Sequence, residues 1–438
     1  MNPSSFGLDA RVIFITVAAA ILSSLQADVV HAQSRTSISL AEVYRLAAAA
    51  PRVSAATSLA EAARRRIPSA KLPPDPELQL GFMNRELPSL APMDPLGMTQ
   101  ILLMQMLPLG GKLRLSGRIA SYAADAASAR ATDVRWDVRA RAAMQFYDLY
   151  AAESQLTIAR ETKRLVQDIA KVSQSMYSVG EAKQADVLRA QVEVARMSEE
   201  ITRMETMRTS MGAKLGAILD LPLDALPQSA ELPAFPDSLP PLDVLAAEAE
   251  RRRPMIIAGE RDLASAQASE RLARKELWPD LQVGIQYGWR TGEMGTEKMG
   301  SLMLGASVPV HARSRQIRMR EEAAAMRRMS AADLAAMRAE TRSRIAELYA
   351  GYTRARNLRT LYRTTILPQA EATVTASFAA YRVGEVNLMT LMDNQMTVNR
   401  YRQELITLDA EQGKAIAEIE MLLGRELFDP ESARRAGR

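Results

Sequence analysis

The stretches YSVGEAKQADVLRAQ at 177–191 and YRVGEVNLMTLMDNQ at 381–395 are two versions of one pattern. Each places Tyr-x-Val-Gly-Glu between long segments that have the mixed polar and apolar spacing of helices. Other residues recur at a similar separation: Pro51 with Pro254, Pro76 with Pro279, Pro108 with Pro309, Tyr147 with Tyr349, and Tyr150 with Tyr352. The separation drifts only from about 201 to about 204 along the chain, which predicts a tandem duplication.

The duplication divides the chain into repeats at 33–220 and 242–425, which a Pro-rich linker at 221–241 joins and a C-terminal tail at 426–438 follows. Ala, Arg, Glu, Leu and Met dominate and aromatic residues make up only 5%, which is typical of a mainly helical protein. The net charge of +5 is spread along helical segments with acidic residues between, so we expect solvated helix surfaces and no nucleic-acid partner.

Residues 1–32 have the features of a signal peptide. Arg11 precedes an apolar run, and Val30 and Ala32 form the small-residue pattern expected before cleavage at Gln33. We therefore expect export, and a core helix at the start of the chain is the alternative. The chain has no cysteine, which excludes disulfides and thiolate sites, and we expect no transmembrane helix elsewhere, so a membrane-embedded form would have to use β-strands.

Four segments are predicted to be strands, at about 77–87, 99–108, 280–292 and 299–310. In the third, alternate residues put apolar side chains on one face and Gly or Gln on the other, as in strands that face lipid on one side. Soluble hairpins packed on helices are the alternative. An open sheet in lipid would leave edge N–H and C=O groups unsatisfied at a cost of several kcal/mol each, so the membrane interpretation requires several copies to pool their strands.

The remaining segments predict very long helices. Lys112 to Tyr177 contains no proline and would span roughly 100 Å at 1.5 Å per residue. A second helix is expected from Glu181, and the other repeat is expected to have one interrupted at Pro368 and one beginning at Glu385. Such lengths favour coiled-coil packing over a compact core.

The order of these features resembles the TolC-like outer-membrane efflux factors, and PLGGKLR at 108–114 is similar to their heavy-metal (CzcC-like) branch. The resemblance implies a mainly α fold with a transmembrane β-barrel part, in which a homotrimer combines long helical hairpins as an α-barrel with four strands per protomer. It also implies the exit duct of a tripartite efflux system for drugs or heavy-metal ions, in the Gram-negative outer membrane and extending into the periplasm. The implied partners are a periplasmic adaptor (membrane fusion) protein and an inner-membrane pump of the RND type.

The resemblance also implies roles for residues near the two VGE turns. The turns would be the periplasmic tips that contact the adaptor: Val179, Gly180, Glu181, Val383, Gly384 and Glu385. The pore and its gate would involve Asp186, Tyr381, Thr390 and Asp393. Two departures from the family weaken the expected gate, because Thr390 replaces a common aspartate and Val386 an arginine that some members carry. Simple connectors at both turns, and a helix-dipole role for Asp186, are the alternatives.

No catalytic, cofactor or metal site is predicted. The two histidines, His31 and His311, are far apart in sequence, and no catalytic or nucleotide-binding motif is present. Methionines gather on the predicted strands, where apolar filling is a better explanation than binding of Cu(I). Two other functions stay open: the outer-membrane component of a type I protein or peptide secretion system, and a periplasmic coiled-coil adaptor or structural protein.

Overall fold

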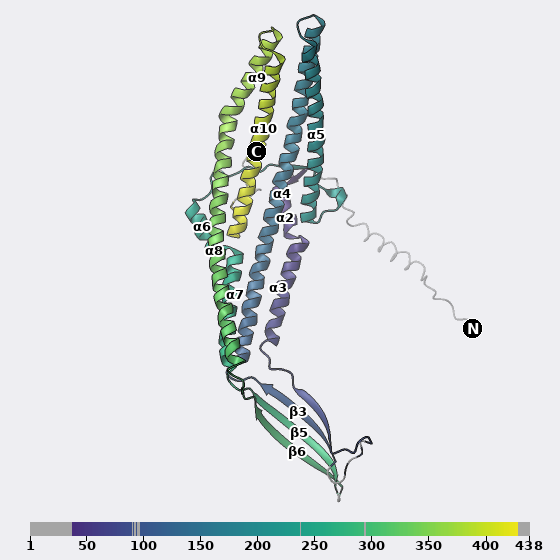
Figure 1. The fold of residues 1–438 in the computed structure, drawn as a ribbon, viewed down its shortest axis with the longest axis vertical. Coiled ribbons are helices and arrows are strands. Elements are labelled where there is room, and N and C mark those ends of the chain that lie inside the picture. The colour runs from purple at the N-terminus through teal and green to yellow at the C-terminus, as the bar shows by residue number, and fades with distance from the viewer. Residues whose placement is uncertain are drawn as a thin grey trace, which may run out of the picture.

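The computed structural model describes residues 37–427 apart from 90, 92, 94–96, 237 and 293–294. The signal peptide expected at 1–32 and most of the expected tail lie outside the described residues. The molecule is elongated, with a body of long helices that meets a curved four-stranded sheet at one end (Figure 1).

The helical body is built from two long hairpins and shorter flanking helices. The helices are α2 (Leu40–Ala48), α3 (Pro51–Ser69), α4 (Lys112–Ser178), α5 (Gln184–Leu219), α6 (Leu242–Arg252), α7 (Pro254–Lys275), α8 (Gln316–Leu361), α9 (Leu367–Arg382) and α10 (Leu388–Leu423). The interruption expected at Pro368 takes the form of a π turn, η2 (Tyr362–Ile366), which separates α8 from α9, and Pro368 takes one of the first positions of α9.

The sheet has the order β2-β3-β5-β6, with all neighbouring strands antiparallel. Its strands are β2 (Glu77–Met83), β3 (Met98–Leu107), β5 (Leu281–Gly292) and β6 (Gly295–Ala306). The register places Leu78, Leu103, Ile285 and Leu302 in one row across all four strands, and each is exposed by 45–69%. One face of the sheet is therefore apolar and uncovered within a single chain.

Two strand ends differ from their predicted positions. β2 ends at Met83, because Asn84 adopts a left-handed conformation with φ of +48° that takes the chain out of the sheet. β6 covers Gly295–Ala306 in place of 299–310, because Gly295 already pairs with Gly292 of β5, and the ladder ends before Pro309, which lacks an N–H to donate.

The two repeats share one core, in which α10 crosses α4. Tyr147 of α4 is 1% exposed, and its ring packs edge-on to Phe146. Gly413 of α10 faces this ring so closely that a Cβ atom on it would lie 2.3 Å from Tyr147 Cζ. A buried hydrogen bond of 3.1 Å from Thr162 Oγ1 to Asn399 Oδ1 joins the same helices further along. The repeats are thus locked by close packing along α4 and α10.

The linker is part of the body and not only a spacer. A three-residue strand within it, β4 (Ser229–Glu231), pairs in parallel with β1 (Ser37–Ser39). Beyond β4, Phe235 packs against the core clusters of both repeats, with its ring centroid 6.1 Å from that of Tyr147. The linker therefore ties the first repeat to the second around the waist of the molecule.

A buried cation fixes the sheet to the helices. Lys112, the first residue of α4, donates from Nζ to Asp280 Oδ1 at 2.8 Å and to the Trp278 carbonyl oxygen at 3.0 Å, and its side chain is only 6% exposed. The pair spans the two repeats, because Asp280 directly precedes β5. Within the described residues, no helix combines the length and apolarity needed to cross a membrane.

Candidate gate and docking tips

The first tip is closed by a Schellman motif, in which a left-handed glycine ends the helix. Gly180 has φ of +82° and donates to the Tyr177 carbonyl oxygen at 3.1 Å, while Glu181 N donates to the Met176 carbonyl oxygen at 2.8 Å. These two bonds satisfy carbonyl groups that the end of α4 would otherwise leave unpaired. Val179 stands outside this turn, with 69% of its surface exposed.

The second tip repeats this geometry at the end of α9. Gly384 has φ of +78° and donates to the Tyr381 carbonyl oxygen at 3.1 Å, while Glu385 N donates to the Ala380 carbonyl oxygen at 3.0 Å. Val383 is 71% exposed. No atom lies within 4 Å of a Cβ built on either tip glycine, so the backbone conformation, and not crowding, requires glycine at both tips.

The returning helices begin three residues later than predicted, because each tip includes an N-cap residue. In the first tip Lys183 is the N-cap of α5, and its N–H donates to Asp186 Oδ2 at 3.4 Å. In the second, Asn387 is the N-cap of α10, and its side-chain oxygen accepts from Thr390 N at 2.9 Å. Asp186 and Thr390 occupy equivalent positions in the repeats, and both are engaged in capping.

Tyr381 lies in the helical interior and not on the tip surface. It is 4% exposed and belongs to an apolar cluster that joins both hairpins, made of Val166, Ile169, Ala190, Tyr381, Leu388, Leu391 and Met392. Its hydroxyl group is buried without a hydrogen-bond partner among the described residues. Its counterpart Tyr177 is 42% exposed, so the two tips differ in how this shared tyrosine is used.

Asp393 is exposed and lies in a groove of about 530 Å³ between α5 and α10. The α5 wall alternates in charge along one face, with Arg189, Glu193, Arg196, Glu200 and Arg203. The α10 wall contributes methionines, among them Met392 and Met396. The Asp393 carboxylate therefore lies in a groove that has both positive and negative side chains on one wall and methionine side chains on the other.

The structure brings Asp393 and Arg189 into one groove but keeps Tyr381 apart in the core. Arg189 was not predicted from the sequence. The duplication does contain a signal for it, since Arg189 occupies the position in the first repeat that Asp393 occupies in the second. The capping residues Lys183 and Asn387 were not predicted either. Across the described ranges, no group of three or more His, Asp or Glu side chains is arranged to hold a metal ion.

Comparisons with known proteins point to one family. The family model described as outer membrane efflux protein matches residues 36–219 and 245–425. The cobalt-zinc-cadmium resistance protein CzcC of Cupriavidus metallidurans is 25% identical over 323 residues, which cover 72% of this chain and 75% of that protein.

Two further proteins extend the comparison. The pyoverdine export outer membrane protein OpmQ of Pseudomonas putida is 24% identical over 285 residues, which cover 63% of this chain and 59% of OpmQ. The crystal structure of the outer membrane protein VceC of Vibrio cholerae superposes with a TM-score of 0.75 at 15% identity, over 89% of this chain and 97% of VceC. At that identity the likeness to VceC concerns the fold.

Proposed function

Because this chain belongs to the outer membrane efflux protein family, it is the outer-membrane exit duct of a tripartite efflux system, and we propose that it works as a homotrimer. The observation that carries the trimer is the open sheet. In the described residues β2 and β6 each have a strand on one side only, and the apolar face between them is exposed. In a membrane these edges need partners, and neighbouring copies can supply them.

The chain count can be tested by mass measurement in detergent, where we expect three protomers. Because the sequence contains no cysteine, the edges can also be cross-linked cleanly. A chain with both Gln79→Cys in β2 and Ser301→Cys in β6 should form ladders of up to three chains on oxidation, whereas neither single variant should go beyond two. A monodisperse monomer that stays soluble without detergent would contradict the trimer.

We further propose that the two tips of each chain contact a periplasmic adaptor protein, which links the duct to an inner-membrane pump of the RND type. The supporting features are the matching Schellman motifs and the exposed Val179 and Val383. Three chains would present six similar knobs, each with a valine, a glycine and a glutamate. Nothing in this proposal requires a catalytic step.

The tip contact can be tested at Gly384. Valine there would be strained at positive φ, which should distort the knob and reduce export at normal outer-membrane abundance. Gly384→Asn should retain export, because asparagine tolerates the left-handed region. Gly295→Val is the matched control, since Gly295 also has positive φ and open surroundings but lies at the far end of the sheet. Equal loss of export in Gly295→Val, or loss of abundance in Gly384→Val, would contradict a docking role.

We propose that Asp393 lines the constriction of the resting duct, where three copies would form a carboxylate ring. Its exposure in the groove beside α5 supports this. Asp186 and Thr390, which take part in the N-cap hydrogen bonds, lie one turn nearer the tips. Tyr381 would act differently, by holding the two hairpins together through the apolar cluster. Opening of the duct would then require the packing around Tyr381 to loosen.

We propose small solutes as the cargo, with divalent heavy-metal ions as the class to test first. The support is the similarity to CzcC, whose name concerns cobalt, zinc and cadmium, over 72% of the chain. A strain that lacks the gene should become sensitive to these ions and recover on complementation. Recovery of growth on neutral drugs alone would contradict metal ions as the cargo and favour drug efflux. Recovery of polypeptide secretion alone would favour a type I secretion system.

A further inference from the structure

The positive charge of this chain is concentrated at one level, where the helices meet the sheet. Four chain segments pass this level, at 64–77, 107–120, 270–282 and 307–322. Together they contain 14 Lys and Arg residues against seven Asp and Glu, a net charge of +7, whereas the whole chain has +5. The remainder of the chain is therefore slightly acidic, and the excess of cations belongs to this zone.

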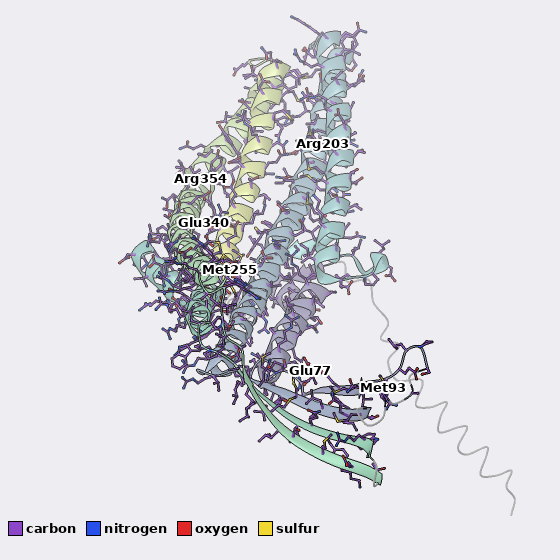
Figure 2. The ribbon with its side chains drawn as sticks, turned by 60° about the horizontal axis from the view of Figure 1, so that its bottom comes forward. Glu77, Met93, Arg203, Met255, Glu340 and Arg354 are labelled. Atoms are coloured by element: carbon purple, nitrogen blue, oxygen red, sulfur yellow. The ribbon has the colours of Figure 1, made fainter. Side chains whose placement is uncertain are left out.

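The sheet register places the four segments side by side. Leu281 pairs with Leu107 on one side and with Ala306 on the other, and Glu77 begins β2 opposite Met104. Figure 2 shows Glu77 at the end of the sheet nearest the helices, well away from Arg203 along the body. The cations of the four segments therefore lie at one level in a band across the molecule, which we call the basic collar.

Most cations of the basic collar are exposed. There are two exceptions: Lys112 is buried against Asp280, and Lys275 is half-buried. Arg318 is exposed but bonded to Glu321 at 2.7 Å. The exposed guanidinium groups with no ion pair among the described residues include Arg64, Arg66, Arg313, Arg315 and Arg320. These groups are available to bind an anion.

Exposed apolar side chains stand among these cations. Val308 and Val310 are 72% and 80% exposed, and Trp278 is 56% exposed with Lys275 Nζ lying 5.1 Å from its ring centroid. Tryptophan and basic side chains next to exposed aliphatic groups are the composition of surfaces at the boundary between lipid tails and headgroups. A surface for soluble anions would not need the aliphatic groups.

We propose that the basic collar binds the headgroups of anionic phospholipids in the inner leaflet of the outer membrane. The inference goes beyond the duct function and rests on the strands lying in that membrane. Phosphodiester oxygens would accept from the arginines, while Val308, Val310 and Trp278 would contact the first carbons of the acyl chains. The collar would thereby set the depth of the sheet in the bilayer and the height of the tips below it.

The test uses the full-length mature protein in detergent with an equimolar mixture of phosphatidylglycerol and phosphatidylethanolamine. Native mass spectrometry then counts both lipids on each assembly, together with the number of chains. We expect wild type to retain phosphatidylglycerol in preference. The triple variant Arg313→Gln, Arg315→Gln, Arg320→Gln should lose this preference about tenfold or more, since one surface cation contributes up to about fivefold. The variant with lysine at the same three positions should keep the preference for phosphatidylglycerol, because it keeps the charge.

A matched control removes three exposed arginines far along the helices, by Arg164→Gln, Arg356→Gln and Arg400→Gln. It carries the same change in net charge and should keep the wild-type preference. Equal loss in this control, or no preference in wild type, would overturn the proposal. So would a collar variant that changes the number of chains but not the lipid preference, because the cations would then contact a neighbouring copy. The chain count in the same spectra reports on the trimer separately.

Discussion

Replacing Gly413 by alanine should destabilise the protein, whereas the same replacement at Gly351 should stabilise it. Both glycines lie inside long helices, α10 and α8, so both variants gain about 1 kcal/mol of helix propensity. At Gly413 the new Cβ would lie 2.3 Å from Tyr147 Cζ, whereas at Gly351 no atom lies within 4 Å. Unstrained carbon contacts need about 3.5 Å, so the ring or the helix must move by more than roughly 1 Å.

The two variants therefore differ only in the cost of overpacking, about 3 kcal/mol at the upper end of the usual range, because Tyr147 is fully buried. Unfolding entropy of about 2 cal/mol/K per residue converts this to a difference of roughly 4 °C between their melting temperatures. The assay is thermal unfolding of both variants in one detergent at one heating rate. Equal melting temperatures would refute the reasoning, because Tyr147 would then have room to move and α4 and α10 would not be close-packed.

Three further predictions follow from the charges. Lys112→Met should destabilise the mature protein by about 3 kcal/mol in the same melting assay, because it leaves Asp280 without its buried partner; an unchanged melting temperature would show that the joint is hydrated. Hydrogen bonds from Arg425 hold the pKa of Glu248 below its ordinary 4.5, which stabilises the folded state above that pH and is lost as pH falls through the lowered pKa. Arg425→Gln should therefore be less stable than wild type at neutral pH, and the gap should close in acid unfolding titrations, whereas a constant gap would mean that the pair is not titrating. Asp393→Asn should weaken cation preference and block by multivalent cations in single-channel recordings, and identical selectivity in both proteins would place Asp393 away from the lumen.

Local patterns were sufficient to predict the elements that depend on short-range spacing. The alternation in β5 predicted its position within one residue, and the glycine in each VGE turn predicted a reversal. The start of α4 at Lys112 was predicted correctly, whereas the starts of α5 and α10 were predicted three residues too early, because the N-cap role of Lys183 and Asn387 depends on backbone geometry and not on residue type alone. The pairing of β1 with β4 was not predicted, because three-residue strands far apart in sequence have no measurable periodicity.

The candidate site was harder to predict because burial there depends on which helices are neighbours. Tyr177 and Tyr381 occupy the same place in the same pattern, yet only Tyr381 is buried. Tyr381 meets Val166 and Ile169 of α4, and no feature of the repeated sequence specifies that contact. The composition of the whole chain likewise does not indicate the basic collar, since the net charge is only +5. The local excess of Lys and Arg becomes apparent only when the sheet register places the four segments side by side.

The π turn at Tyr362–Ile366 bears on how the two halves have diverged since duplication. From Tyr150 to Gly180 the chain advances 30 residues, but from Tyr352 to Gly384 it advances 32. A π turn takes up one more residue than an α turn, so η2 absorbs one of the two additional residues inside an otherwise continuous helix. Both tips still lie at the same end of the molecule (Figure 1). About half of a length change that would otherwise lift one knob and rotate its side chains about the helix axis is thus taken up within a single loosened turn, so an insertion in one hairpin is partly absorbed before it reaches that hairpin's tip.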